Sequence, residues 1–252
     1  MDYATVIETP RYAFLRKDEH LGGNIILLTL SGARSYGTNV PGSDIDIRGI
    51  TVEKPEEVLG FHDFLAFTDP ETDTTIWGLR HAMRLLSKCT PGCIDLLGSR
   101  PDHIISVSKQ GQMLIDNRKI FLSQIAYEAF MGACKKSLKQ AEKRALENGA
   151  EERKRIDKAL MHQIRLRMTL LDILEKEEII TWRGAERDYL MEIRSGRFTS
   201  MKGQILPEFY ELLNDWDKRL EYTKSATSLP PCSDYEAIEE LLIQIYRETL
   251  LK

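Results

Sequence analysis

The chain has 252 residues, of which 42% are hydrophobic and 29% charged, and its formal net charge is −4. This composition is typical of a globular protein with one large domain or two modest ones, and the acidity argues against a surface that binds nucleic acid throughout. The sequence contains no apolar run of the roughly 18 residues that a spanning helix needs, and its N-terminus lacks the basic start and apolar core of a signal peptide. We therefore expect a cytoplasmic protein without a membrane partner.

The first part of the chain alternates short strands and short helices. A helix is expected over residues 10–20, and the apolar run at 24–32 predicts a buried strand that ends at a glycine. The alternation over 44–52 predicts a half-buried strand. Residues 74–79 then predict a third strand, and the apolar spacing over 79–89 predicts a helix. This half indicates a small mixed β-sheet with helices on one side.

After about residue 115 the pattern becomes helical throughout. The polar stretch 147–155 predicts a turn between two long helices. We therefore predict an α+β protein with a sheet domain at 1–115 and an all-helical domain at 116–252. The segment 135–167 holds 11 Lys and Arg against 5 Asp and Glu, a local net charge of +6 that can attract phosphates, although a solvated helix face is an equal alternative for most of these lysines.

The cysteines are too few and too irregular for a disulfide framework. They are Cys89, Cys93, Cys134 and Cys232. A zinc site formed by the C-x3-C pair with His81 and His103 is one alternative, but this spacing matches no common zinc motif. We favour ordinary reduced thiols.

Two aspartates begin the strand expected at 44–52. Residues i and i+2 of a strand share a face about 6.5–7 Å apart, so Asp44 and Asp46 should point the same way, and Ile45 and Ile47 should point into a core. Two like charges at this distance raise each other's pKa unless a cation lies between them. Hard divalent cations such as Mg²⁺ prefer carboxylate oxygens, and a pair of such ions suits phosphoryl or nucleotidyl transfer.

A glycine turn, "SGARSYG" at 31–37, precedes these aspartates. Gly32 lets the backbone approach a ligand closely, and successive N–H groups of such a turn can bind phosphate oxygens. The stretch is no P-loop, because no Lys-Ser/Thr pair follows. A glycine turn or a D-x-D pair alone is weak evidence, whereas their combination at this spacing is more specific.

The combined stretch resembles the strand-turn-strand motif of the DNA polymerase β-like nucleotidyltransferases. Within that superfamily it is most similar to predicted bacterial and phage nucleotidyltransferases associated with RNA repair (the YcgL- or RlaP-like group), whose pattern is G-S-R-x-Y-G followed by S-D-x-D-x-R-G. The chain has "GARSYG" and "SDIDIRG". Further similar segments cover most of the chain: "DTTIWGLRHAMRLLSKCTPGCIDLL", "FLSQIAYEAFMGACKKSLK", "KALMHQIRL", "LMEIRSGRFT" and "SLPPCSD".

The resemblance implies a set of roles. Asp44 and Asp46 would bind two Mg²⁺ ions, for which Mn²⁺ could substitute, and the turn at Gly32, Ala33 and Ser43 would bind the nucleotide. Ala33 stands where the family has a serine, so one side-chain hydrogen bond to phosphate, worth about 0.5–1.5 kcal/mol, is missing unless Ser31 or Ser35 supplies it. Arg34 and Arg48 are expected either as supports of the site or as partners of nearby carboxylates.

The superfamily also needs a third carboxylate, which completes a metal site and helps to deprotonate the attacking hydroxyl. Asp73, just before the strand expected at 74–79, is our first choice. Asp95 is the main alternative, followed by Asp69 and Glu71. A turn or capping residue is the structural alternative for Asp73.

A polar stripe lies on the helix expected over 158–174. At about 100° per residue, its members share one narrow face between apolar neighbours: Lys158, His162, Arg165, Thr169 and Asp172. Lys158, His162 and Arg165 match a family hallmark, and we expect them to contact the triphosphate or an acceptor phosphate in a cleft between the two domains. Interdomain packing is the alternative for these three residues. Arg167, about 200° further round, should point away from the nucleotide.

The predicted reaction is therefore transfer of a nucleoside monophosphate from an NTP to a hydroxyl acceptor, expected to be RNA, with release of pyrophosphate. Ala33 favours an alternative in which a degenerate transferase binds a nucleotide or RNA without catalysis. A further alternative is a transferase that modifies a protein or a small molecule. The sequence leaves the base preference, the acceptor and the oligomeric state open.

Overall fold

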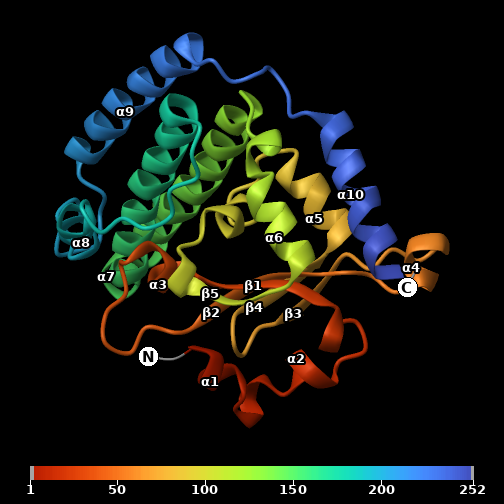
Figure 1. Cartoon of the computed structure of the whole chain (residues 1–252). Coiled ribbons are helices and arrows are strands. Elements are labelled where there is room, and N and C mark those ends of the chain that lie inside the picture. Colours follow the sequence, from red (N-terminus) through yellow and green to blue (C-terminus); the bar gives the residue numbers. More distant parts are fainter. Residues whose placement is uncertain (1–2, 251–252) are drawn as a thin grey trace. The chain divides into compact units, whose positions relative to one another are not determined.

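The computed structural model describes residues 3–250, which form two compact units (Figure 1). Among the described residues, the sheet unit comprises 3–121 and 233–250, and the helical unit comprises Leu122–Cys232. The predicted α+β class is confirmed.

The sheet unit is built on one mixed sheet of five short strands in the order β3-β4-β2-β1-β5. Its strands are β1 (Ile25–Ser31), β2 (Asp46–Thr51), β3 (Ala66–Asp69), β4 (Thr74–Gly78) and β5 (Ile104–Val107). β2 and β4 are parallel, and the other neighbours are antiparallel. β1 lies between β2 and β5 and is buried over its whole middle, where its side chains are apolar on both faces except for Thr29.

Helices lie against both faces of this sheet, not against one as the sequence led us to expect (Figure 1). Tyr12 and Leu15 pack on Leu28, Ile47 and Ile76 from one side. On the other side α5 contacts β2 and β4, and α6 contacts β1 and β5. The α-helices of this unit are α1 (Tyr3–Ile7), α2 (Phe14–Lys17), α3 (Gly32–Tyr36), α4 (Pro55–Leu59), α5 (Leu79–Leu86), α6 (Lys109–Asp116) and α10 (Tyr235–Leu250). The 3-10 helices are η1 (Pro10–Tyr12), η2 (Gly22–Asn24), η3 (Ile94–Gly98), η4 (Pro101–His103) and η5 (Arg118–Phe121).

The last helix, α10, belongs to the sheet unit and packs on α5, α6 and η5. The Ser233 hydroxyl hydrogen-bonds the carbonyls of Ser87 and Phe121, both at 2.8 Å, and the Tyr246 hydroxyl donates to buried Glu53 at 2.8 Å. Burial, followed by the charge of Glu53, raises the pKa of Tyr246 strongly. The two compact units therefore have other bounds than the domains expected at 1–115 and 116–252. That these two domains have separate functions stays a prediction.

The helical unit contains α7 (Ile125–Lys176), α8 (Arg187–Arg194) and α9 (Pro207–Ala226). α7 folds back on itself at Asn148, whose φ of −143° and ψ of 39° are not helical (Figure 1). Its two limbs are joined by a hydrogen bond of 3.0 Å from the Gln163 amide to the Cys134 carbonyl. The polar turn expected over 147–155 is therefore confined to one residue, since the backbone is helical again from Gly149.

Three local predictions were wrong or incomplete. β2 begins at Asp46, so Asp44 lies in the preceding loop and not in the strand. The predicted helix over 10–20 consists of η1 and α2. The sequence reading also missed β3 and β5, which have only four residues each and depend on pairing with β4 and β1. Within residues 3–250, none of the helices combines the length and the hydropathy that crossing a bilayer requires.

A close approach at the bend of α7 gives a test of the fold. Gly203 has φ +74°, and a Cβ there would overlap the Gly149 carbonyl. We expect Gly203→Ala to lower the free energy of unfolding by about 2 kcal/mol or more, because strain and overlap add. Denaturant unfolding measures this change.

Gly132→Ala is the matched control for that variant. Gly132 lies on an exposed part of α7, and nothing lies within 4 Å of a Cβ placed there. Since alanine is the better helix former, this variant should gain about 0.5–1 kcal/mol. Equal effects of the two substitutions would contradict the described packing of the bend.

Candidate active site

The candidate site lies where four strands of the sheet unit end together. The C-terminal ends of β1 and β3 meet the N-terminal ends of β2 and β4, since Ser31 pairs with Asp46, Ile47 with Thr74, and Asp69 with Thr74. This register brings the glycine turn after β1 next to the first aspartate of β2. Asp73, just before β4, lies one residue beyond the Ile47–Thr74 pair.

Gly32 and Asp46 form the closest contact of this site. Gly32 has φ +60°, and a Cβ at this position would overlap the Oδ2 atom of Asp46. Only glycine therefore allows both the left-handed backbone of the turn and the observed position of the carboxylate. The half-buried Asp46 side chain lies directly beside the first residue of α3.

Arg34 holds the loop that carries Asp44. Its Nε donates to the Asp44 carbonyl at 3.0 Å, and its Nη2 donates to the Ser43 carbonyl at 2.8 Å. The Val40 N–H donates to the Ser43 hydroxyl at 2.9 Å and closes the turn before it. Arg34 thus supports the site through backbone carbonyls, and the exposed Asp44 side chain remains at the surface.

Arg48 fixes Asp73 beside β2. Its Nη2 lies 2.9 Å from Asp73 Oδ1, and its Nη1 donates to the carbonyls of Ile47 and Asp73. Asp73 adopts φ +45° and its side chain is 61% exposed. The Ile47 N–H also donates to the Asp73 carbonyl at 3.3 Å. Asp73 is therefore held at the same end of the sheet as Asp46, with an arginine as its ionic partner.

Asp95, the main alternative to Asp73, has another role in this structure. It is buried in η3, and its Oδ2 accepts a hydrogen bond of 2.6 Å from the Tyr36 hydroxyl. Tyr36 is the last residue of α3, so the contact ties the helix that follows Gly32 to η3. Asp69 likewise closes its own turn, accepting from the N–H and the hydroxyl of Thr72 at 3.1 and 2.5 Å.

A hollow of about 400 Å³ opens at this end of the sheet. Its lining includes Arg11, Tyr12, Arg34, Asp44 and Asp73. The Arg11 guanidinium donates to the Glu71 carbonyl at 2.6 Å. Burial raises the pKa of the Tyr12 hydroxyl, the charge of Arg11 opposes this shift, and the charges of Asp46, Asp44 and Asp69 add to it. Tyr12 is therefore a neutral hydroxyl close to the predicted metal-binding carboxylates.

These carboxylates fit Mg²⁺ in their chemistry. Among residues 3–250 there is no group of three or more His, Cys, Asp or Glu side chains that could hold a metal by themselves. Mg²⁺ does not require such a group, because it commonly uses one or two carboxylates together with water and substrate phosphates. Asp44 lines a hollow with room for a ligand, whereas Asp46 lies two residues further along, beside Gly32, and is not part of that lining. Both provide hard oxygen donors, so the residues present are compatible with the ion.

The serine hydroxyls that could replace the hydroxyl of the family's serine differ in burial and in the hydrogen bonds that they already make. Ala33 itself is half-buried in α3. Ser35 is buried and donates to the Gly32 carbonyl at 3.1 Å, and the Ser43 hydroxyl accepts from the Val40 N–H. Ser35 would have to break its own contact to reach a phosphate. Ser31, half-buried at the end of β1, is the better placed of the two serines weighed as replacements.

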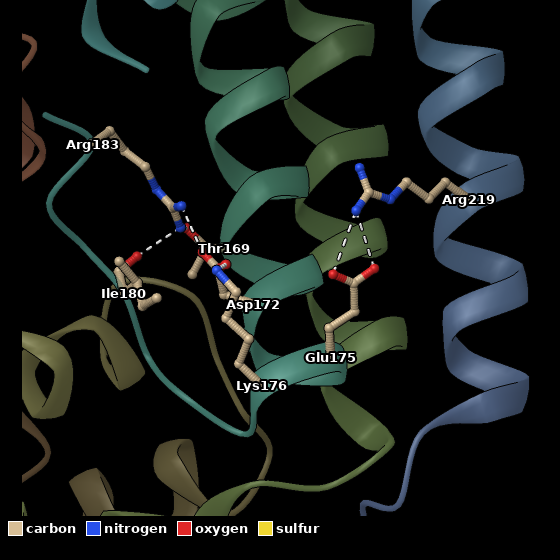
Figure 2. A network of polar contacts seen from close by, with 7 residues as sticks. All are labelled: Thr169, Asp172, Glu175, Lys176, Ile180, Arg183 and Arg219. Carbon is tan, nitrogen blue, oxygen red and sulfur yellow. Dashed lines mark hydrogen bonds and ion pairs between the residues drawn. The ribbon is translucent and has the colours of Figure 1, made fainter. Parts of the chain in front are cut away.

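In the helical unit, the far end of the predicted polar stripe on α7 is an internal network. Figure 2 shows Arg183 reaching Thr169 and Asp172, at 3.0 and 2.6 Å, and the Ile180 carbonyl at 2.7 Å. Lys176 lies 2.8 Å from the other oxygen of Asp172. The Arg183 and Asp172 side chains are only 3% and 8% exposed. Thr169 and Asp172 thus fasten the segment after α7 to the helix, which excludes them from the exposed part of the stripe.

The N-terminal end of the stripe, at Lys158, His162 and Arg165, is not part of this network. Lys158 is exposed, His162 is half-buried, and Arg165 is 2% exposed. Arg165 Nη2 lies 3.3 Å from His162 Nδ1. Burial, followed by the charges of Arg165 and Lys158, lowers the pKa of His162 to about 3. His162 is therefore a neutral ring that accepts at Nδ1 and carries its proton at Nε2, and not the cation that a phosphate site would favour.

Arg167 points away from this stripe, as predicted, but it is a structural residue. It is 3% exposed, its Nε donates to Asp217 of α9 at 2.8 Å, and its Nη1 donates to the Gln163 side chain at 2.9 Å. Replacing it would leave the buried Gln163 side chain without its donor, remove the ion pair with Asp217 and destabilise the helical unit. That Lys158, His162 and Arg165 contact a nucleotide stays a prediction.

The cysteines behave as reduced thiols. All four are free, and Cys89, Cys93 and Cys134 are buried. The Cys89 thiol donates to the Phe121 carbonyl at 3.1 Å, and burial raises the pKa of Cys93. Within the described residues no metal-ligand cluster forms around the C-x3-C pair with His81 or His103.

Three residues around the site were not predicted from the sequence. Arg11 and Tyr12 come from the N-terminal segment, and Tyr36 anchors α3 through Asp95. Tyr36 belongs to the motif "GARSYG", so its position offered a signal. Arg11 and Tyr12 offered none, because more than 30 residues separate them from the aspartates.

Comparison with known proteins identifies a family that matches the chain. The sequence model of a family described as "RlaP: RNA repair pathway DNA polymerase beta family" matches residues 11–244. No curated protein and no solved structure matches the chain significantly. The match spans most of both compact units.

The lowered pKa of His162 predicts a pH-dependent stability. Because the folded pKa of about 3 lies below the usual value of 6.5, the unfolded chain binds the proton first as the pH falls. Between pH 7.5 and 5.5 this group should remove about 1.4 kcal/mol from the free energy of unfolding. Denaturant unfolding of the parent and of His162→Gln at both pH values measures the difference. An unchanged pH dependence in the variant would contradict the neutral state of this half-buried ring.

Proposed function

Since the chain belongs to the RlaP family, the RNA repair pathway DNA polymerase beta family, we propose that it is a metal-dependent nucleotidyltransferase that moves a nucleoside monophosphate from an NTP to a hydroxyl of RNA. The observation that carries this proposal is the contact of Gly32 with Asp46, in which a left-handed glycine turn lies directly beside a carboxylate. A phosphate-binding turn and a metal-binding carboxylate must lie this close, because both act on the same triphosphate.

In the proposed reaction the acceptor hydroxyl attacks the α-phosphorus of the NTP. A P–O bond forms to the acceptor, the bond to the β-phosphate oxygen breaks, and pyrophosphate leaves. The hydroxyl proton passes to a carboxylate of the site, for which Asp73 is our choice because Arg48 holds it at the end of the sheet that carries Asp46. The backbone N–H groups of the turn at Gly32 and Ala33 would orient the phosphates.

Asp44, Asp46 and Asp73 are the residues that would hold two Mg²⁺ ions. When bound, these ions neutralise the phosphates and make the acceptor hydroxyl easier to deprotonate. Arg34 keeps the Asp44 loop in place through the Ser43 and Asp44 carbonyls. Tyr12, a neutral hydroxyl in the same hollow, could donate a hydrogen bond to substrate.

A non-catalytic nucleotide- or RNA-binding protein is the second candidate, and one observation favours it. Ala33 replaces the family's serine, and Ser35 already donates to the Gly32 carbonyl. If no other hydroxyl makes this hydrogen bond, the protein binds the triphosphate more weakly. Incubation with Mg²⁺ and mixed NTPs separates the two candidates, because only the transferase releases pyrophosphate. Transfer of radiolabel into RNA, protein or neither then identifies the acceptor.

The carboxylates give the sharpest test of the enzyme. Asp44→Asn and Asp46→Asn should each abolish pyrophosphate release, and Mg²⁺ should raise the melting temperature of the parent but not of these variants. Asp63→Asn is the control, since Asp63 is an exposed carboxylate that pairs with Arg80 at 3.3 Å outside the hollow. Near-parental turnover in either site variant would refute the two-metal assignment.

The alanine at position 33, where the family pattern has a serine, gives a second test. Ala33→Ser restores the hydroxyl of the family pattern and should tighten NTP binding by a few-fold, as one added hydrogen bond of about 1 kcal/mol predicts. Equilibrium titration of both proteins with an NTP and Mg²⁺ measures the change. If affinity is unchanged or falls, the turn does not bind phosphate as proposed.

A further inference from the structure

α7 carries an exposed basic surface on both of its limbs. On the first limb Lys136, Lys139 and Lys143 lie within an arc of roughly 60°, and on the second limb Lys154, Arg155 and Lys158 lie within roughly 100°. All six side chains are exposed. We call these six residues the α7 basic surface.

The two groups of cations lie on the same side of the folded helix. The hydrogen bond from Gln163 to Cys134 sets the limbs side by side. Both limbs turn their apolar residues toward α8 and α9, with Ala141 on one limb and Leu160 and Ile164 on the other. The basic residues of the first limb point roughly 140–160° away from Ala141, and those of the second limb point roughly 80–180° away from Leu160 and Ile164. Both groups therefore face mainly away from the core of the helical unit.

The charge of this surface is not balanced by its own acids. Three carboxylates accompany the six cations, namely Glu147, Glu151 and Glu152, which leaves a net charge of +3. Two of these acids are already engaged, because Glu147 lies 3.8 Å from Lys143 and Glu152 lies 2.8 Å from Arg155. Lys136, Lys139, Lys154 and Lys158 have no ion-pair partner among residues 3–250.

The opposite side of the same unit has the reverse sign. α9 holds five acids (Glu208, Glu211, Asp215, Asp217 and Glu221) against three bases (Lys218, Arg219 and Lys224), a net charge of −2. A helix that is merely solvated would not require this separation of charge between two faces. Like charges held this close repel one another, and a polyanion that binds across them relieves the repulsion.

We propose that the α7 basic surface binds the phosphate backbone of RNA. The choice of RNA as the polyanion rests on the proposed function, whereas the location of the surface rests on the helical unit alone. The stretch of α7 that carries this surface, residues 135–158, contains no aromatic residue, so no base stacking on it is expected. Binding should therefore tolerate any sequence and depend strongly on salt, because released counterions supply its free energy.

Three lysines outside the predicted nucleotide contacts test this surface. The triple variant Lys136→Gln, Lys139→Gln and Lys154→Gln removes three exposed charges that have no ion pair. The matched control is Lys17→Gln, Lys88→Gln and Lys218→Gln, which removes three exposed charges outside α7. Both proteins should remain folded by circular dichroism, since such surface changes usually alter stability by about 0.5 kcal/mol or less each.

The probe is a fluorescein-labelled single-stranded RNA of about 20 nucleotides, longer than the roughly 4–16 nucleotides that one surface commonly covers. Its anisotropy is followed without NTP or Mg²⁺, between roughly 50 and 200 mM salt. We expect the α7 variant to bind at least about tenfold more weakly and to lose about 2 from the slope of log affinity against log salt concentration. The control should stay within about twofold of the parent.

The failure of this inference is distinguishable from the failure of the proposed function. Asp63→Asn should bind the same RNA as the parent does, because Asp63 lies in the sheet unit, outside both the hollow and α7. Loss in the α7 variant alone supports the surface even if no nucleotidyl transfer is found. Equal losses in the two triple variants, no loss in the α7 variant, or a parent that binds no RNA would overturn it.

Discussion

The absence of a side chain at Gly32 is the constraint on which the candidate site depends. A Cβ there would overlap the Asp46 carboxylate, and the backbone has φ +60°, so the position requires glycine for two independent reasons. Pairing of Ser31 with Asp46 sets this contact by strand register. Other residues hold the remaining parts of the site. Arg34 holds the Asp44 loop, Arg48 holds Asp73, and Tyr36 anchors the helix that follows the glycine.

Four arginines of this protein illustrate two uses of the side chain, which differ in burial and in partner. Arg183 and Arg167 are almost fully buried and each pairs with an aspartate, so they stabilise the helical unit through hydrogen bonds that water cannot replace. Arg34 and Arg48 lie near the surface of the sheet unit, where they position backbone carbonyls and the Asp73 carboxylate. The exposed cations of α7 show neither use, because most of them have no partner among the described residues. That difference separates structural charges from charges available to a ligand.

The polar stripe on α7 shows why a helical pattern identifies a face but not its use. Spacing alone placed Lys158, His162, Arg165, Thr169 and Asp172 together. Thr169 and Asp172 are used by Arg183, which lies beyond the end of the helix and in a segment with no helical pattern (Figure 2). Burial beside two cations keeps His162 neutral, a property that depends on its surroundings in three dimensions. The stripe is thus divided into an internal network and an end, Lys158, His162 and Arg165, whose contact with a nucleotide stays a prediction.

The sequence by itself determined the α+β class, the strand before the glycine turn, the family motif and the change to helices after residue 115, because periodicity and short motifs are local properties. Only the tertiary structure decided where β2 begins, which helices cover the sheet and that the last helix returns to the sheet unit. The tertiary structure also places Arg11 and Tyr12 beside Asp44. It pairs Asp95 with the Tyr36 hydroxyl and does not place it with Asp44, Asp46 and Asp73. The reason is physical: β3 and β5 are too short to specify themselves, and the partner of a buried charge is chosen by packing between segments far apart in the chain.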